Sequence, residues 1–287
     1  MPWKRLVENW RKQRVESGTT EQKRKAGRER RIFDLLNRTT PLDALDALMR
    51  AYRPEPLAIR LAETAIVLDS SAFLRLGSFD DVVDYLDTHH AGPLILPGQS
   101  IQEFWNNNLN VADSIATGIG KRFEALKQET EKVDSAFHDY AGRFSALLAE
   151  FRLSFGYAYD GITVRRTHAL FEALHRRAIT CYTSREPFSA LASHRKRTKT
   201  PPGFKDDGDG DFFVWLDLLQ GVLIAKERDH TFSRVALVTH DKKLDWSREG
   251  IAHPVLNAEM QALAGVPFET WDITKLVREV ASYSDSD

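Results

Sequence analysis

The sequence predicts an α/β fold in which helices cover a parallel central sheet. Three short runs, residues 65–68, 94–96 and 235–238, are apolar at every position, and longer segments with helical spacing separate them. A short run of this kind is typical of a strand buried on both faces, as in a parallel sheet covered by helices. A carboxylate follows each run within seven residues, and ligand sites in such sheets lie beyond the carboxyl ends of the strands.

The composition is that of a soluble protein with an ordinary charge content. The 287 residues are 42% hydrophobic and carry a net charge of −1, which allows one large domain or two small ones. The single cysteine, Cys181, excludes an internal disulfide and fits a reducing compartment. The sequence has no run of 18 apolar residues and no apolar signal core near its start. We therefore expect a cytoplasmic protein that does not contact a membrane.

Residues 1–60 are predicted to form a basic helical extension that differs in character from the rest of the chain. Residues 1–31 contain eleven Lys or Arg and four Glu, a local excess of seven positive charges. Leu42, Leu45 and Leu48 then begin an apolar stripe at helical spacing. Two interpretations of the basic run stay open, a solvated helix face or an arm that binds phosphates.

The first apolar run leads directly into Asp69, Ser70 and Ser71. A carboxylate at this edge of the sheet can reach a metal or a substrate. The alternative is that Asp69 begins a turn or caps the next helix, which are common positions for Asp. The same pattern recurs downstream, and this recurrence favours a site.

The second run, residues 94–96, is ended by Pro97 and followed by Glu103 in the first turn of a predicted helix. Ser100 and Glu103 have the spacing of a capping box, in which the Glu side chain reaches back to the helix start. Glu103 therefore has the same two interpretations as Asp69, a site residue or a helix cap.

Residues 115–155 carry apolar residues at heptad-like spacing, which predicts one long helix packed against a partner helix. Residues 163–181 show a second helical pattern and are expected to supply that partner. An irregular stretch at 183–210 follows and ends among four aspartates, Asp206, Asp207, Asp209 and Asp211.

Asp211 is predicted to be the N-cap of a helix that is apolar almost all round and should therefore be buried. The third apolar run, residues 235–238, is followed by Thr239 and Asp241, so a carboxylate again stands just beyond a strand end. A further candidate strand covers residues 268–271.

In a doubly wound sheet, Asp69, Glu103, Asp211 and Asp241 would meet at one edge. Carboxylates held close together repel one another and persist with a compensating cation. A site made of oxygen ligands selects Mg²⁺ or Mn²⁺, whereas zinc prefers His and Cys. The chemistry typical of such a site is hydrolysis at phosphorus, in which one or two ions activate water and stabilise the leaving oxygen.

Several of these segments together resemble the motifs of the PIN-like nucleases. The most specific are Pro-Pro-Gly-Phe-Lys-Asp at 201–206 and Thr-x-Asp-Lys-Lys-x-Asp-Trp at 239–246, which resemble a bacterial subgroup with a large helical insertion. The other matching segments are residues 67–71, 95–97, 103–107 and 210–215. The resemblance covers roughly residues 64–275 and leaves residues 1–60 unexplained.

The resemblance implies a three-layer α/β/α fold with a parallel central sheet. The nuclease domain would span residues 61–287, with a helical insertion at about 111–200. The PIN-like nucleases are divalent-metal endonucleases, so the resemblance implies Mg²⁺ or Mn²⁺ as the cofactor. The ligands carried over by the motifs are Asp69, Glu103, Asp211 and Asp241.

Asp206 and Asp245 lie in the subgroup motifs and are candidates to join the metal site. Only four residues separate Asp206 from Asp211, where the family has a longer, lysine-containing loop. Which of Asp206, Asp209 and Asp211 faces the metal therefore stays open, although the match at the helix start favours Asp211.

The resulting prediction is metal-dependent hydrolysis of RNA, with single strands favoured over duplex. Bases of single strands can stack on aromatic side chains, and basic segments neutralise phosphates. The lysines expected to steady the phosphate, with solvated loop charge as the alternative, are Lys205, Lys242 and Lys243. The hydroxyls expected to hydrogen-bond the ligands or the scissile phosphate are those of Ser70, Ser71 and Thr239.

Two other functions stay open. The first is a DNA endonuclease that acts as a defence or toxin effector, because no motif reads the 2′-hydroxyl. The second is a catalytically silent PIN-like scaffold that binds nucleic acid or a protein, although the presence of all four acids argues against it. Nucleic acid is the expected partner, and the helical regions are expected to serve a homo-oligomer or a regulatory partner.

Overall fold

A computed structural model of the chain describes residues 20–52, 59–77, 79–111, 115–132, 139–155, 161–241 and 243–284. Its centre is a five-stranded parallel sheet with the order β3-β2-β1-β4-β7. The strands are β1 (Thr64–Leu68), β2 (Leu94–Pro97), β3 (Ile179–Cys181), β4 (Arg234–Val238) and β7 (Phe268–Trp271). All four strands predicted from the sequence are present. The α/β class with a parallel central sheet is therefore confirmed.

Helices and short helical turns connect the strands. In chain order they are a helix of residues 20–36, α2 (Ala44–Ala51), η1 (Leu61–Glu63), α3 (Ser70–Leu76), α4 (Asp80–Asp84), η2 (Tyr85–His89), α5 (Gly98–Val111), α6 (Ile115–Glu131), α8 (Tyr140–Phe155), α9 (Gly161–Arg177), η4 (Glu186–Phe188), α10 (Ser189–Arg197), α11 (Gly210–Glu227), α12 (Pro254–Ala264) and α13 (Ile273–Ser284). A small hairpin, β5 (Ser247–Arg248) and β6 (Ile251–Ala252), precedes α12. None of the described helices is both long enough and apolar enough to span a bilayer.

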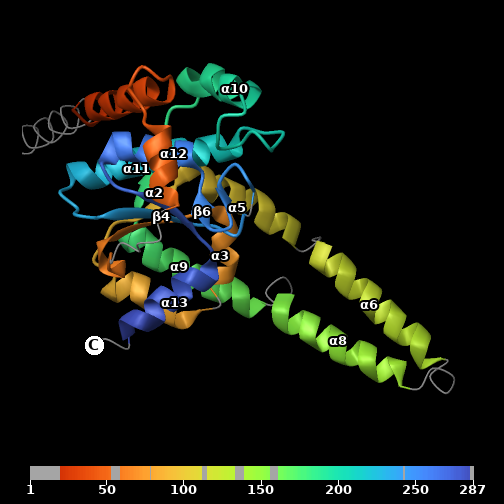
Figure 1. Cartoon of the computed structure of the whole chain (residues 1–287). Coiled ribbons are helices and arrows are strands. Elements are labelled where there is room, and N and C mark those ends of the chain that lie inside the picture. The colour runs from red at the N-terminus through yellow and green to blue at the C-terminus, as the bar shows by residue number, and fades with distance from the viewer. Residues whose placement is uncertain are drawn as a thin grey trace, which may run out of the picture.

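Two hydrophobic cores lie on opposite faces of the sheet, which gives three layers (Figure 1). Val67 and Leu237 enter the core formed with the helix of residues 20–36, α10, α11 and α12. Their neighbours Leu68 and Val238 enter the core formed with α3, α4, α5, α9 and α13. Successive side chains of a strand point to opposite faces, so a strand between two helical layers must be apolar at every position.

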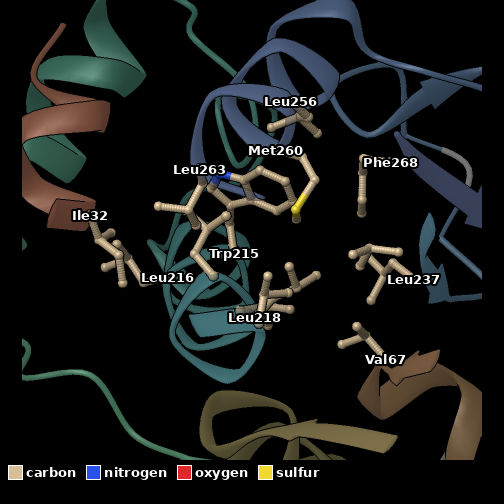
Figure 2. Close-up of a cluster of buried hydrophobic side chains, with 14 of the residues drawn as sticks. Ile32, Val67, Trp215, Leu216, Leu218, Leu237, Leu256, Met260, Leu263 and Phe268 are labelled. Atoms are coloured by element: carbon tan, nitrogen blue, oxygen red, sulfur yellow. The ribbon is translucent and has the colours of Figure 1, made fainter. Parts of the chain in front are cut away.

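Helix α11 is the centre of the first core. Figure 2 shows Trp215 and Leu216 of this helix between Ile32 on one side and Met260 and Phe268 on the other. Trp215 is fully buried, and its ring packs edge-on against Phe268 at 4.9 Å between centroids. The predicted burial of this nearly all-apolar helix is confirmed.

The strand order places a topological switch at the middle of the sheet. The chain moves outward from β1 to β2 and β3, and then returns to form β4 on the other side of β1. All five residues of β1 pair in register with those of β4. Ligand sites in open parallel sheets lie beyond the carboxyl ends of the strands at such a switch. Asp69 and Thr239 lie at this edge of the sheet.

The region predicted as a helical insertion, about residues 111–200, contains the strand β3 as well as helices. Ile179–Cys181 form the edge strand β3, and α10 packs on the first core through Leu191 and Ala192. The sequence assigned residues 179–181 to a helix because a three-residue strand is too short to show a period of two. The helical segment between β2 and β3 ends with α9, which packs against α3.

The single long helix predicted for residues 115–155 is wrong. The described residues of this range form two helices, α6 and α8, which pack against each other and project from the body of the molecule as a hairpin (Figure 1). Each of two paired helices needs an apolar stripe, so the heptad-like spacing continues through both and does not reveal the reversal between them. The partner expected at 163–181 instead lies on the body as α9.

The N-terminal region is helical, as expected for residues 20–36 and 44–51, but it is not separate from the domain. Ile32 and Leu36 are buried in the first core, and Arg28 is 4% exposed and pairs with Glu227 at 2.7 Å. Part of the basic run is therefore structural. Residues 1–19 and 53–58, which also belong to the predicted extension, lie outside the described residues.

Candidate functional site

Asp69 stands at the end of β1 and is held by hydroxyl groups. Its backbone N–H donates to the carbonyl of Val238 at 3.0 Å, which joins the ends of the two central strands. Oδ2 accepts hydrogen bonds from Ser71 at 2.7 Å and from Thr239 at 2.9 Å. Asp69 occupies the N-cap position of α3, but its side chain makes no capping hydrogen bond in the described structure. Asp69 is therefore the N-cap residue of α3 by position, while its carboxylate binds hydroxyl groups instead of the helix backbone.

Glu103 lies on α5 and faces the same edge. Oε1 accepts a hydrogen bond from Gln99 at 3.0 Å, and Oε2 accepts one from Ser70 at 3.3 Å. Because α5 begins at Gly98, Glu103 lies in the second helical turn and its carboxylate does not form the expected capping box with Ser100. Ser100 instead lies 3.5 Å from Asp69 Oδ1 through its hydroxyl.

The environment of Glu103 disfavours its ionised form. Burial raises its pKa, and the nearby charge of Asp69 raises it further. Gly210 makes the close approach of α11 possible, because a Cβ atom at this position would lie 2.5 Å from Glu103 Oε1. This contact brings the start of α11, and with it Asp211, against α5.

Asp206 and Asp211 form a carboxyl pair beside the start of α11. The helix begins at Gly210 with Asp209 at the N-cap position, so Asp211 lies in the first turn and is not the predicted cap. Burial and a hydrogen bond with Asp206 raise the pKa of Asp211 to about 7. Burial opposes ionisation of Asp206 as well, but hydrogen bonds from Lys243 and Asp211 lower its pKa. Asp206 and Asp211 both face the ammonium group of Lys243.

Lys243 is the cation at the centre of these acids. Its Nζ lies 2.5 Å from Asp206 Oδ2, 2.7 Å from Asp241 Oδ2 and 3.3 Å from Asp211 Oδ2. Burial lowers the pKa of Lys243, but hydrogen bonds to Asp206 and Asp241 outweigh this and raise it well above its usual range. Lys243 thus contacts carboxylates from two segments of the chain, residues 206–211 and Asp241.

Asp241 connects the hydrogen bonds around Asp69 with the ion pairs of Lys243. Its backbone N–H donates to Thr239 Oγ1 at 3.0 Å, and the same hydroxyl donates to Asp69. Ser71 lies 3.1 Å from Thr239 through their hydroxyls and accepts a hydrogen bond from the backbone N–H of His240 at 2.9 Å. Ser71 and Thr239 therefore orient the acids from within the protein.

Asp245 does not join the other acids, although the motif made it a candidate metal ligand. It is fully buried, and its Oδ2 accepts hydrogen bonds from the backbone N–H groups of Gly203 at 3.0 Å and Lys205 at 3.3 Å. It holds the loop that carries Asp206. The side chain of Lys205 is exposed, and Lys242 lies outside the described residues.

A buried carboxylate outside the motifs supports Glu103. Asp217 on α11 is fully buried and accepts hydrogen bonds from the backbone of Gln99 at 2.9 Å and of Thr183 at 2.7 Å. It also pairs with Arg185 at 3.0 Å, and Arg185 donates to Gln99 Oε1 at 3.3 Å. The opposite end of the Gln99 amide donates to Glu103. The signal for Asp217 in the sequence is one acid within an apolar helix, since a buried charge requires partners.

The carboxylate and hydroxyl oxygens that meet here fit Mg²⁺ or Mn²⁺ in their chemistry. Three or more His, Cys, Asp or Glu side chains arranged to hold a metal ion are not found in the part of the chain that the structure describes. Asp206, Asp211 and Asp241 converge on the ammonium group of Lys243 instead.

A cavity of 280 Å³ adjoins the acids on the side of β7. It is lined by Thr239, His240, Asp241, Ser247, Glu249, Gly250, Thr270, Trp271 and Asp272. The site is thus open to a ligand between the carboxyl ends of β4 and β7 and the β5–β6 hairpin.

The fold and this edge define an α/β protein with an acidic site at the topological switch of a parallel sheet. Comparison of the chain with family models, with curated proteins and with solved structures finds no match.

Proposed function

We propose that the protein is a PIN-like, divalent-metal-dependent endonuclease that hydrolyses single-stranded RNA. The observation that carries the proposal is the meeting of Asp69, Glu103, Asp206, Asp211 and Asp241 at the sheet's switch point, where five separate positions of the chain contribute a carboxylate. So many acids at one ligand-binding edge are typical of a cation site in phosphodiester hydrolysis. The motif resemblance supports the same class.

Within this proposal each group has a defined role. Asp69, Glu103, Asp211 and Asp241 would hold Mg²⁺ or Mn²⁺, and the bound ion would supply Lewis-acid activation of the phosphate and of water. Ser71 and Thr239 orient Asp69, and Gln99 orients Glu103. Lys243 keeps the acids together and presents a positive charge to a phosphate. The lining of the 280 Å³ cavity offers space for the nucleotide beside the scissile bond.

The experiment compares cleavage of labelled RNA and DNA, single-stranded and duplex, in Mn²⁺, Mg²⁺ and EDTA. We expect cleavage of single-stranded RNA in either metal and none in EDTA. Asp69→Asn and Asp241→Asn should each abolish cleavage with an unchanged circular dichroism spectrum, because each removes a ligand charge and keeps the side chain's size. Asp229→Asn is the matched control, since Asp229 is an exposed turn residue after α11. Full turnover in either site variant would refute the proposed site.

The contacts of Lys243 support a second candidate function, that of a PIN-like scaffold that binds nucleic acid without cleaving it. An ammonium group among three carboxylates offsets part of their charge without a metal. Such a protein would bind RNA equally well in Mn²⁺ and EDTA and would release no product in either. Preferential cleavage of DNA in the same experiment would instead identify the DNA endonuclease.

A further inference from the structure

A second cavity lies close to the acids, between α2 and the β5–β6 hairpin. Its volume is 410 Å³, and we call it the α2 cavity. Binding sites for small ligands have volumes of roughly 300–1,000 Å³ and apolar walls that carry a few polar groups. The α2 cavity has both properties. The residues that contribute its walls include Leu48, Tyr52, Leu244, Arg248, Glu249 and Ile251.

The apolar wall is made by a helix face that the domain core does not use. α2 packs against α12, and Ala47 is its buried residue. Leu48 and Tyr52 are four residues apart and therefore share one face of the helix, and they are 37% and 70% exposed. Leu244 adds a third apolar side chain, which is 52% exposed. Large apolar side chains gathered around one cavity are typical of a ligand site.

The polar part of the lining includes Arg248, Glu249 and His253. His253 precedes α12, and its Nδ1 accepts a hydrogen bond from the backbone N–H of Val255 at 3.2 Å. Burial lowers the pKa of His253, although nearby acids oppose this, so the ring is neutral at pH 7 and carries its proton on Nε2. The cavity therefore offers N–H donors from His253 and Arg248 and an acceptor from Glu249.

The α2 cavity and the 280 Å³ cavity lie on opposite sides of the β5–β6 hairpin. Ser247 lines the cavity at the acids, whereas Arg248 and its ladder partner Ile251 line the α2 cavity. Successive side chains of a strand point to opposite faces, so the hairpin forms the wall between the two cavities. Glu249, at the turn of the hairpin, lines both of them.

The turn at the end of this wall is narrow. Glu249 and Gly250 have φ values of 53° and 82°, the left-handed conformation of a two-residue hairpin turn. A Cβ atom at Gly250 would meet no atom of the described residues within 4 Å, apart from its chain neighbours, so space continues around the turn. Leu244 in the α2 cavity directly follows Lys243, whose Nζ lies 2.7 Å from Asp241. A strand that crosses the turn can therefore place adjacent groups in the two cavities.

We propose that the α2 cavity binds an unpaired nucleobase of the strand whose phosphodiester lies at the acids. A base is a flat ring with donors and acceptors on its edge, so it can stack on Tyr52 while its edge meets the polar lining. The apolar walls would leave a phosphate poorly solvated, so the base enters and the backbone stays outside. A base reaches the cavity only when it is unpaired, which accounts for a preference for single strands. This inference deepens the proposed function and rests on it.

The first test measures binding of a fluorescein-labelled 12-nucleotide single-stranded RNA and of its duplex by anisotropy. Ca²⁺ replaces Mn²⁺ in the buffer, because it is also an oxygen-seeking cation. Tyr52→Ala should weaken single-strand binding by roughly 5- to 100-fold, the range of one lost base stack. The slope of log affinity against log salt should not change, since no phosphate contact is lost. Duplex affinity should stay within about 2-fold of the wild type, because paired bases do not enter the cavity.

The second test removes the bases instead of the ring. A strand of the same length in which every nucleotide is abasic keeps the phosphates and has nothing to place in the α2 cavity. The wild type and Tyr52→Ala should bind this strand within about 2-fold of each other, because the stack that distinguishes them is absent. The comparison isolates the contact between Tyr52 and a base from any other effect of the substitution.

Tyr52→Phe and Tyr140→Ala are the controls. The first keeps the ring and removes only the hydroxyl, so single-strand affinity should stay within about 2-fold of the wild type. The second removes a tyrosine that is 43% exposed on α8, away from the α2 cavity, and should have no effect on binding. Unchanged melting temperatures exclude a fold defect in the variants.

Cleavage of the same RNA in Mn²⁺ is assayed in parallel, so the results separate this inference from the proposed function. Wild-type cleavage with unchanged single-strand affinity in Tyr52→Ala overturns the base site and leaves the nuclease intact. A loss of affinity that is equally large for the duplex or for the abasic strand also overturns the base site. Single-strand binding that depends on Tyr52 and on the bases, without cleavage in Mn²⁺, overturns the nuclease and keeps the base site. Wild-type protein that does not bind single-stranded RNA overturns both.

Discussion

Side chains at the carboxyl edge of the sheet are fixed by residues far away in the sequence, whereas the α6–α8 hairpin is held by its own two helices. Thr239 binds Asp69 across 170 positions, and Lys243 binds Asp206 across 37. Leu126 and Leu147 of the hairpin are 42% and 44% exposed, and the described residues of α8 bury Ala141 and Leu148. Side chains from several chain segments keep their positions only through contacts between those segments. A projecting hairpin needs only the contacts between its own two helices. Substitutions in the two regions should therefore differ sharply in their effects.

The largest effect is expected for Asp217→Ala. The change removes the partner of Arg185 and leaves two backbone N–H groups without an acceptor. Loss of a buried, paired charge costs about 3–5 kcal/mol, which corresponds to roughly 10 °C in melting temperature for a chain of this size. Thermal melting monitored by circular dichroism measures the change. A decrease of only one or two degrees would show that the support of Gln99 and Glu103 does not depend on Asp217.

Two smaller effects are expected for Lys243→Met: lower stability without metal and higher affinity for Mn²⁺. Without metal, the variant should melt below the wild type, because three carboxylates lose their counter-charge. Its affinity for Mn²⁺, measured by calorimetry, should increase because no ammonium group competes for the same oxygens. Mn²⁺ should therefore raise the melting temperature more in the variant than in the wild type. Weaker Mn²⁺ binding would show that Lys243 arranges the ligands and does not compete with the ion.

A moderate effect of pH is expected for the metal-free protein. The raised pKa of Asp211, about 7, and of Glu103 mean that the folded protein binds more protons than the unfolded chain between about pH 4 and 7. Stability should therefore increase as pH falls from 7 toward 5, and decrease as pH rises through the same range. Urea unfolding in EDTA at several pH values measures this trend. Asp211→Asn should flatten it, and an equally steep trend in that variant would assign the effect to other groups.

The smallest effect is expected in the hairpin. Leu147→Ala should change stability by less than about 1 kcal/mol, because much of the side chain is already exposed. Cleavage in Mn²⁺ should remain at the wild-type level. A loss of stability equal to that of Asp217→Ala would remove the contrast between the two regions.

Three apolar runs predicted β1, β2 and β4 well, because a strand buried on both faces has no polar position to obscure it. These runs also pointed to the acids, because each acid follows a predicted strand or opens a predicted buried helix. The acids concerned are Asp69, Glu103, Asp211 and Asp241. The short β3 and the reversal between α6 and α8 were missed because neither leaves a periodic signal. The position of Lys243 among the acids and the buried place of Asp245 depend on tertiary contacts that spacing does not encode.

The pairing of β1 with β4 has a consequence for protein synthesis. The two strands at the middle of the sheet are made at opposite ends of a 170-residue interval, and the last contributors, Asp241 and Lys243, come after it. A ribosome adds roughly 5–20 residues each second, so the first half of the domain waits on the order of ten seconds for its partner strand. Truncated translation products that stop before β4 cannot contain the assembled acids. The acids can come together only after residue 243 has been added to the growing chain.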